Sequence, residues 1–184
     1  MKPKIFDDFF DIHLINYISY SVQHPDYPWS YNSCITQTQG EEPWHFGMSR
    51  KFLDSEYPDI KECPEDKLFF PIFFKIQEEF ELSFSNLLRA RLDMTFRSPD
   101  NTLHKPHVDM GENPHYSFIV YLNDSDGDTI IFNETSRSDK YSIQEVVSPK
   151  KNRLLAFGGH HYHTGHSPSK NNNRVILNVN YGIN

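Results

Sequence analysis

The chain has 184 residues, a length typical of one domain whose core can form without disulfides or a structural metal. Its 25 acidic and 18 basic residues give a net charge of −7, the wrong sign for a protein that binds by neutralising phosphates. No apolar run approaches the roughly 20 residues that a membrane-spanning helix needs, and the first residues, MKPKIFDDFFDIH, carry Asp where a secretory signal would be apolar. Composition therefore predicts one globular domain that is not secreted, has no membrane partner and is unsuited to nucleic acid.

The cysteine content favours a reducing compartment. Cys34 and Cys63 lie 29 positions apart, and neither belongs to a CxxC pair. Two reduced thiols are therefore expected, and with them a cytoplasmic location.

Two amphipathic helices are predicted in the N-terminal half. Residues 5–23 space apolar side chains at steps of three and four, which is typical of a helix with one buried face. Residues 24–50 are rich in Pro, Gly, Asn and Ser and predict loop or irregular strand, and the sequence leaves open whether residues 24–66 form a lid. Residues 67–82 repeat the helical pattern, with Pro71 in the first turn. The predicted buried side chains are Phe10, Leu14, Ile15, Ile18 and Val22 in the first helix and Phe70, Phe73, Phe74, Ile76 and Phe80 in the second.

After residue 86 the apolar side chains recur at every second position. Residues 86–97 therefore predict a half-buried strand, on whose polar face Arg89 and Arg91 could point either into a functional pocket or into solvent. Further short strands are predicted at residues 116–122, 129–132, 143–147, 153–157 and 174–181. The expected architecture is α+β: an N-terminal helical support layer, residues 1–85, packed on an antiparallel β-sandwich, residues 86–184, within a single domain 1–184.

A His-x-Asp motif is the first feature that suggests chemistry. His107 and Asp109 lie in HKPHVDM, and in an extended segment two residues that are two positions apart point to the same face. An imidazole and a carboxylate on one face make two-thirds of the 2-His-1-carboxylate triad that holds Fe(II) with open coordination positions. The motif alone is weak, because a surface His and Asp in a loop would look the same.

Downstream, the stretch HHYHTGH places four of the ten histidines within residues 160–166. Eleven residues after His163, Arg174 opens the last predicted strand, RVILNVNY. A buried guanidinium needs an anion that it can bind through two hydrogen bonds, and a dicarboxylate would supply one.

These motifs together resemble those of a known family. HVD at 107–109, YLNDSDGDTIIF at 121–132, RLLAFGGHHYHTGH at 153–166 and RVILNVNY at 174–181 are similar, in this order, to the double-stranded β-helix (jelly-roll, cupin-like) core of the Fe(II)/2-oxoglutarate-dependent oxygenases. The likeness is greatest to the prolyl-4-hydroxylase-like branch and to the small oxygenases of that type in bacteriophages, for which the cytoplasm would be that of the host. It covers roughly residues 86–184.

The resemblance implies a role for five side chains. His107, Asp109 and His163 would be the metal ligands and catalytic residues, Arg174 would bind the distal carboxylate of 2-oxoglutarate, and Tyr121 would reach the same carboxylate. It also implies Fe(II), 2-oxoglutarate and O2 as cofactors and cosubstrates, and hydroxylation of a C–H bond with release of succinate and CO2.

Two positions near the second motif can be compared with the family pattern. Gly127 matches the family's glycine after YLN, whereas Asp128 replaces the more usual second glycine. That departure concerns a turn and leaves the expected ligands unchanged.

The remaining histidines have other expected roles. His166 is an alternative third ligand, since it lies only three residues after the preferred one. His160 and His161 are more typical of solvated or hydrogen-bonded side chains, and His104 and His115 could line the mouth of a pocket.

The sequence narrows the substrate only to a class. The family members that repair alkylated bases carry a second arginine six positions after the first, where this chain has Asn180. This difference and the acidic charge argue against nucleic acid and leave a protein side chain such as prolyl, or a small molecule. The rival functions are a non-catalytic cupin-like binding module and a zinc hydrolase that would give Arg174 no role. The oligomeric state is left open.

Overall fold

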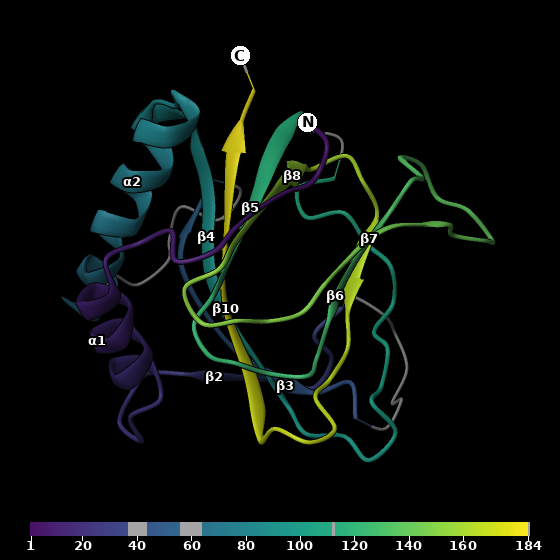
Figure 1. Cartoon of the computed structure of the whole chain (residues 1–184), viewed down its shortest axis with the longest axis horizontal. Helices are drawn as coiled ribbons and strands as arrows, with labels where there is room; N and C mark the ends of the chain where they lie inside the picture. Colours follow the sequence, from purple (N-terminus) through teal and green to yellow (C-terminus); the bar gives the residue numbers. More distant parts are fainter. Residues whose placement is uncertain (37–43, 56–63, 112, 184) are drawn as a thin grey trace.

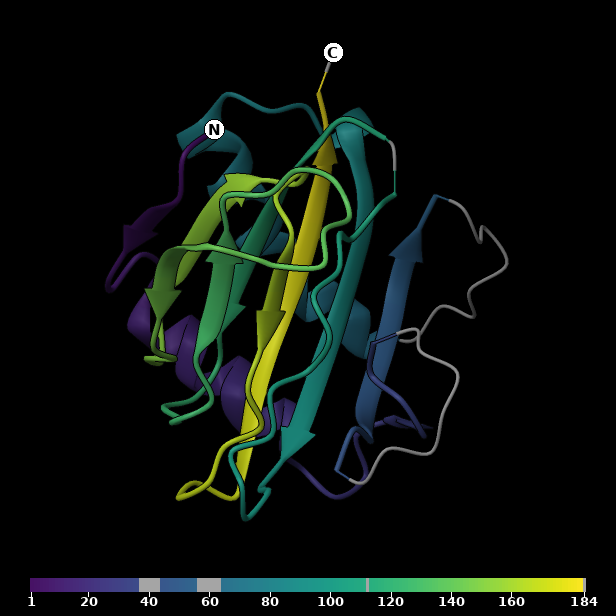
Figure 2. The ribbon, with the colours of Figure 1, turned by 90° about the vertical axis from the view of Figure 1, so that its right-hand side faces the viewer.

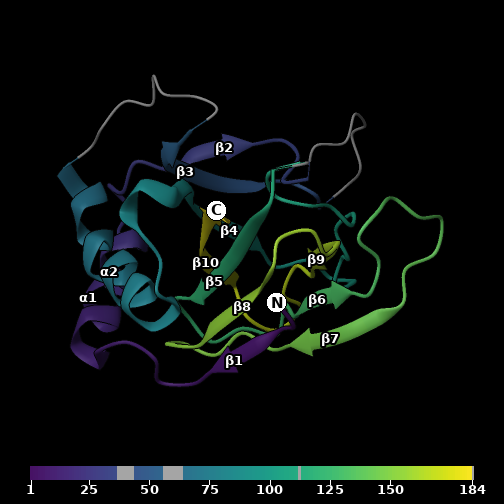
Figure 3. The same cartoon turned by 90° about the horizontal axis from the view of Figure 1, so that it is seen from above.

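The computed structural model describes residues 1–36, 44–55, 64–111 and 113–183. Two helices cover one face of a large antiparallel sheet, and a small sheet faces its other side, so that the molecule has three layers (Figures 1 and 3). The helices are α1 (Ile12–Val22) and α2 (Phe70–Phe80). The short 3-10 segment η1 (Pro64–Phe69) precedes α2, and a second one, η2 (Phe84–Asn86), follows it. The predicted double-stranded β-helix with a helical support layer is confirmed.

The large sheet has seven strands in the order β1-β8-β5-β10-β4-β3-β2, seen face-on in Figure 2. Its strands are β1 (Lys4–Phe6), β2 (Ser30–Asn32), β3 (Gly47–Asp54), β4 (Leu87–Phe96), β5 (His115–Tyr121), β8 (Leu154–Gly158) and β10 (Asn173–Gly182). The small sheet has the order β7-β6-β9, from β6 (Thr129–Phe132), β7 (Ile143–Val147) and β9 (His163–Gly165). Strand β10 lies near the middle of the large sheet, between β4 and β5.

The N-terminal half contributes more to the sheet than the sequence predicted. Strands β1, β2 and β3 join the large sheet, so the sheet also draws on residues before 86, alongside the helical and loop layer expected there. The sequence left open whether residues 24–66 form a lid. Of this segment, residues 37–43 and 56–63, with Cys63 among them, lie outside the described part, while the described remainder includes β2 and β3. The Cys34 thiol donates to the carbonyl of Thr36.

The helix boundaries follow from capping. Helix α1 begins at residue 12 rather than 5 because the Asp11 carboxylate accepts hydrogen bonds from the N–H groups of His13 and Leu14. Helix α2 has Pro71 in its first turn, as predicted, and ends where Glu81 adopts a left-handed conformation (φ 53°). Within the described residues, neither helix is long and apolar enough to cross a bilayer.

The second helix buries a narrower face than predicted. Phe73 and Ile76 are buried, but Phe74 is 56% exposed and Phe70 is 37% exposed, so these two were assigned to the buried side wrongly. The apolar pattern of residues 67–82 is broader than the stripe that one sheet face can cover.

Strands β4 and β10 serve both sides of the large sheet. The odd-numbered apolar residues of β10 enter the core beneath the helices, as do Ala90 and Leu92 of β4. The alternate positions are also buried, among them Asp93, Arg174 and Asn178, and they face the small sheet. The prediction that β4 is half-buried is therefore wrong, because its polar face lines an interior cavity between the two sheets.

Candidate metal and anion site

Three predicted ligands meet at one point between the sheets. The ligand atoms of His107, Asp109 and His163 lie within 4.8 Å of one another. The two histidines are brought together by the backbone: His107 N–H donates to the His163 carbonyl (3.0 Å), and His163 N–H donates to the His107 carbonyl (2.9 Å). This two-bond bridge ties the His-x-Asp loop to β9, so the ring centroids are 4.5 Å apart.

The hydrogen bonds of the two histidines fix which nitrogen is available. Nδ1 of His107 faces the Lys105 carbonyl (3.2 Å), and Nδ1 of His163 faces the His161 carbonyl (3.2 Å). A carbonyl can only accept, so each Nδ1 carries the proton and each Nε2 keeps its lone pair for a metal. Burial lowers the pKa of His107 and lowers the pKa of His163 to about 4, against the opposing effect of Asp109. Both rings are thus neutral at physiological pH, the form that binds metal.

The carboxylate of Asp109 is held by four side chains. Arg89 donates from Nη2 to Oδ1 (2.6 Å), and Ser117 donates to Oδ2 (3.0 Å). The amide nitrogens of Asn178 and Asn180 also donate to it, at 3.1 Å to Oδ1 and Oδ2 respectively.

This network keeps Asp109 charged in a buried place. Burial raises its pKa, but the positive charge of Arg89, with further contributions from the two histidines and Arg91, holds the pKa well below its usual range. The carboxylate side chain is only 1% exposed, so it reaches a metal without competing water.

The sequence analysis left Arg89 undecided and missed Ser117, Asn178 and Asn180 as functional residues. A signal was present: all four are polar residues at positions in β4, β5 and β10 that alternate with core residues. Only the register of the strands shows that these polar faces converge on Asp109.

Arg174 forms an anion site at the other end of the cavity. Its guanidinium donates from Nη2 to the Thr129 hydroxyl (2.7 Å), and the Tyr121 hydroxyl donates to the same oxygen (2.7 Å). Arg174 is only 5% exposed, its Nε has no hydrogen-bond partner, and no carboxylate of the described chain lies within 4 Å of it. Burial lowers its pKa. A buried cation without an anion is costly, so the site fits a carboxylate from a bound molecule.

The glycine of the second motif makes room for this arginine. A Cβ on Gly127 would lie 2.5 Å from the carbonyl oxygen of His166 and 3.0 Å from Cδ of Arg174. A side chain at residue 127 would therefore displace the guanidinium or the segment after β9.

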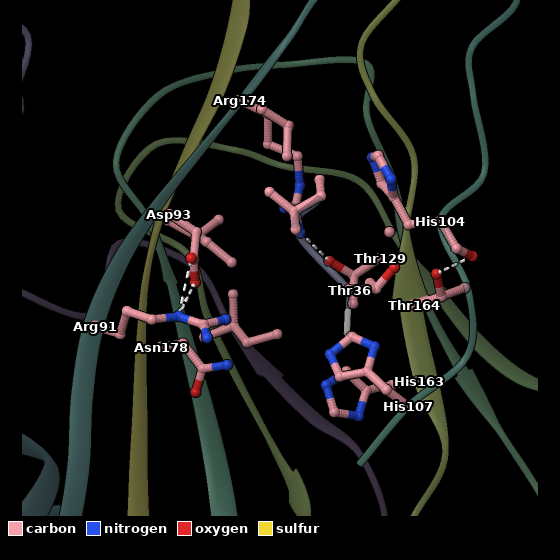
Figure 4. A pocket seen from close by; sticks show the side chains of 15 residues that line it. Thr36, Arg91, Asp93, His104, His107, Thr129, His163, Thr164, Arg174 and Asn178 are labelled. Carbon is pink, nitrogen blue, oxygen red and sulfur yellow. Dashed lines mark hydrogen bonds and ion pairs between the residues drawn. The ribbon is translucent and has the colours of Figure 1, made fainter. Parts of the chain in front are cut away.

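A single cavity joins the two sites, as Figure 4 shows. Arg174 enters at one end, the rings of His107 and His163 lie at another, and Thr129 lies between them. Fe(II) fits the three clustered donors, two imidazoles and a carboxylate. A dicarboxylate such as 2-oxoglutarate fits a cavity that has this donor set at one end and the unpaired Arg174 at the other.

The other histidines lie outside the cluster of candidate ligands found in the described residues. His166 donates its N–H to the Asp128 carbonyl, and its Nδ1 is buried without a partner. His161 faces the carbonyl of Phe132, and His160 is exposed. His115 is buried against Gly159, where a Cβ would lie 2.0 Å from its ring.

His104 lines the cavity, whereas the sequence analysis had placed it no more closely than the mouth of a pocket. Its Nδ1 is 3.3 Å from Nδ1 of His45, and its Nε2 is 3.0 Å from the Ser167 hydroxyl. Burial lowers its pKa to about 3, helped by the nearby His45 and Arg174. His104 therefore contributes an uncharged imidazole to the wall of the cavity.

Replacing His104 by Gln should flatten the pH dependence of stability. The unfolded chain binds a proton at this residue near pH 6.5 but the folded protein does so only near pH 3, so stability falls as the pH drops below 6.5. One such group accounts for a loss of roughly 2 kcal/mol between pH 6.5 and pH 5. Urea unfolding at several pH values measures the slope, with the exposed His13→Gln as control. An unchanged slope in His104→Gln would show that the residue is protonated in the folded state.

Comparison with known proteins agrees with this geometry. The sequence profile of the 2OG-Fe(II) oxygenase superfamily matches residues 94–182. Among proteins of curated function, none matches the sequence.

Solved structures are similar over almost the whole chain. An oxidoreductase of the 2OG-Fe(II) oxygenase family from Burkholderia pseudomallei is 14% identical with a TM-score of 0.70, covering 98% of this chain and 84% of that one. A prolyl-4-hydroxylase from Pseudomonas putida is 13% identical with a TM-score of 0.58, covering 99% and 92%. A prolyl hydroxylase from Trichoplax adhaerens, in complex with a hypoxia inducible factor oxygen degradation domain peptide fragment, is 12% identical with a TM-score of 0.66, covering 98% and 83%. At these identities the likeness shows the fold.

Proposed function

We propose that this chain, whose residues 94–182 match the sequence profile of the 2OG-Fe(II) oxygenase superfamily, is an enzyme of that superfamily and hydroxylates a C–H bond of a protein side chain, such as prolyl, or of a small molecule. Its cofactors are those of the family, Fe(II) with 2-oxoglutarate and O2 as cosubstrates. When bound by this chain, they would supply the oxidising chemistry, with release of succinate and CO2.

The observation that carries the proposal is that the two histidines of the triad line the same cavity as Arg174, which has no carboxylate partner among the described residues. His107, Asp109 and His163 would hold the metal, and three protein ligands leave positions open for a cosubstrate. Arg174 would bind the distal carboxylate, and Thr129 would orient the guanidinium through the hydrogen bond that it accepts. Tyr121 would contribute indirectly, since its hydroxyl donates to Thr129.

The walls of the site are largely buried. Ile119 and Ile176 line the cavity, and the hydroxyl and imidazole groups that join them are buried. Excluding water strengthens each charged contact inside and protects the bound cosubstrate from side reactions.

Two observations bear on the substrate class. One structurally similar prolyl hydroxylase holds a peptide fragment, which supports a protein side chain as substrate. The net charge of −7 argues against nucleic acid, and Asn180, where the base-repair enzymes have a second arginine, donates to Asp109.

The test is binding of N-oxalylglycine, an inert analogue of 2-oxoglutarate, in the presence of Mn(II). At a ligand concentration of a hundred times Kd, wild type should be stabilised by about 2.7 kcal/mol, and Arg174→Gln should lose most of that gain because the distal carboxylate has no cation. Thermal unfolding measures both, and the exposed Arg97→Gln is the matched control.

The rival functions give different results in this assay. A cupin-like binding module would not be stabilised by N-oxalylglycine, and a zinc hydrolase would be indifferent to Arg174→Gln. Either outcome would overturn the proposed function.

A further inference from the structure

A second arginine faces the cavity, on the side formed by β4. Arg91, Asp93 and Thr95 alternate on that strand and point inward, and Asn178 of β10 pairs with Arg91 in the sheet register. In Figure 4 the guanidinium end of Arg91 points into the cavity, toward the side where His107 and His163 lie. None of the roles proposed above uses these four side chains to bind a ligand. Asn178 has a role only through its hydrogen bond to Asp109.

One edge of the Arg91 guanidinium makes a hydrogen bond to the protein, and the other edge is available for a ligand. Its Nε is 2.9 Å from the carboxylate of Asp93, which is its only hydrogen-bond partner in the described part of the chain. Because Asp93 occupies the Nε edge, the end-on edge formed by Nη1 and Nη2 remains for a ligand. That edge presents two parallel N–H donors, the spacing that a carboxylate accepts.

Neighbouring polar groups also lack partners. The buried Oγ1 of Thr95 and the buried Oδ1 of Asn178 have no hydrogen-bond partner among the described residues. Asn178 is only 4% exposed, and its Nδ2 is already committed to Asp109. Buried polar atoms are normally satisfied, so these atoms point to a polar ligand at this wall.

The charge of the cavity indicates the sign of that ligand. Arg91 and Arg174 are positive and Asp93 is negative, so the charged residues that line the cavity carry a net charge of +1. Arg89 and Asp109 form a neutral pair, and Fe(II) and dianionic 2-oxoglutarate neutralise each other. One positive charge is left once metal and cosubstrate are bound.

We propose that Arg91 and its neighbours on β4 form the substrate subsite and that the substrate is a small molecule with a carboxylate, bound end-on by Arg91. Thr95 can donate its hydroxyl proton to the same carboxylate, and Asn178 Oδ1 can accept from an N–H or O–H of the substrate. This inference rests on the proposed function, and it selects the small-molecule class over a protein side chain.

Propionate is a suitable probe, because it carries a carboxylate and little else. The protein is loaded with Mn(II) and 2-oxoglutarate without O2, so that Arg174 is occupied, and propionate is titrated while its proton relaxation is measured by NMR. Mn(II) accelerates the relaxation of protons that are bound close to it. Wild type should show saturable enhancement, and Arg91→Gln should weaken the binding of propionate at least about tenfold, which corresponds to the loss of one charged contact.

Three further variants separate binding from folding. Arg91→Lys keeps the charge without the planar fork and should give intermediate binding. Asp93→Asn removes a nearby negative charge while still accepting from Nε, so it should tighten propionate binding, which a purely structural role of the pair would not. Arg50→Gln is the matched control, because Arg50 forms an ion pair of similar exposure with Asp66 (2.8 Å) outside the cavity.

The outcomes distinguish this inference from the proposed function. Equal relaxation enhancement in wild type and Arg91→Gln, or none in wild type, would overturn the subsite while N-oxalylglycine binding stands. Stronger enhancement with methyl phosphate than with propionate would overturn the assignment to a carboxylate. Failure of N-oxalylglycine to bind would overturn the function itself.

Discussion

Replacing His163 by Ala should weaken Mn(II) binding by at least about 100-fold and abolish the conversion of 2-oxoglutarate to succinate, whereas His166→Ala should retain both. Losing even a residue that orients a ligand costs roughly 10- to 100-fold in metal affinity, and losing a ligand costs more. The atoms of His163 lie in the cluster with His107 and Asp109, while His166 is outside it. Titration of Mn(II) followed by electron paramagnetic resonance measures the affinity directly.

His166→Ala is also the control for folding in this experiment, since both residues lie in or just after β9. Its Nδ1 is buried without a partner, so its removal leaves no donor unsatisfied among the described residues. Loss of metal binding in His166→Ala, with His163→Ala unaffected, would reverse the assignment of the third ligand.

Arg89→Leu should lower the free energy of unfolding of the metal-free protein by about 3–5 kcal/mol, the usual result of leaving one member of a buried ion pair behind. The side chains of Arg89 and Asp109 are 9% and 1% exposed, and Nη2 lies 2.6 Å from Oδ1. The double variant Arg89→Leu with Asp109→Asn should regain part of this loss, because the uncompensated charge is then gone. Urea unfolding of the two single variants and the double variant gives the coupling energy.

The pH dependence supplies an independent check. The depressed pKa of Asp109 contributes stability above the pKa of the unfolded chain, and this contribution is lost as the pH falls through the folded value. Without Arg89 the folded pKa rises, so metal binding should fail at a higher pH in Arg89→Leu than in wild type. An unchanged stability and an unchanged pH profile would mean that Ser117, Asn178 and Asn180 hold Asp109 without the arginine.

Much of the fold was predictable because the apolar residues of half-buried strands and helices recur in the sequence with the period of the secondary structure. The strands at 129–132 and 143–147 were predicted at their observed limits. Each of the other strands predicted in the C-terminal half begins and ends within one residue of its predicted limits, and only β9 was missed there. Strand β9 has only three residues, too few to show a period. The strands β1 and β2 are equally short, and they form because a partner strand is available at each edge.

The candidate site was predictable only in part, for a related reason. A motif such as HVD contains its own geometry, since two residues on one side of an extended segment must converge. The support of Asp109 by Arg89, Ser117 and Asn180 joins strands β4, β5 and β10, and the sequence does not say which strands are neighbours. The same polar alternation would have suited a strand with one face in water, so the sequence left open whether Arg89 and Arg91 point into a pocket or into solvent.

Strand β10 illustrates what this arrangement demands of the chain. Its even-numbered residues supply Arg174, Asn178 and Asn180 to the cavity, and its odd-numbered residues supply the core beneath the helices. Deleting one residue from this strand would exchange the two sets, placing a guanidinium against the helices and valines in the cavity that contains the candidate metal ligands. A change in length within β10, or within β4, whose two faces are divided in the same way, is therefore not tolerable. The loop of residues 133–142 between β6 and β7, which projects from the body of the molecule (Figure 1), is one place where the chain can lengthen or shorten without altering the register of the strands that line the cavity.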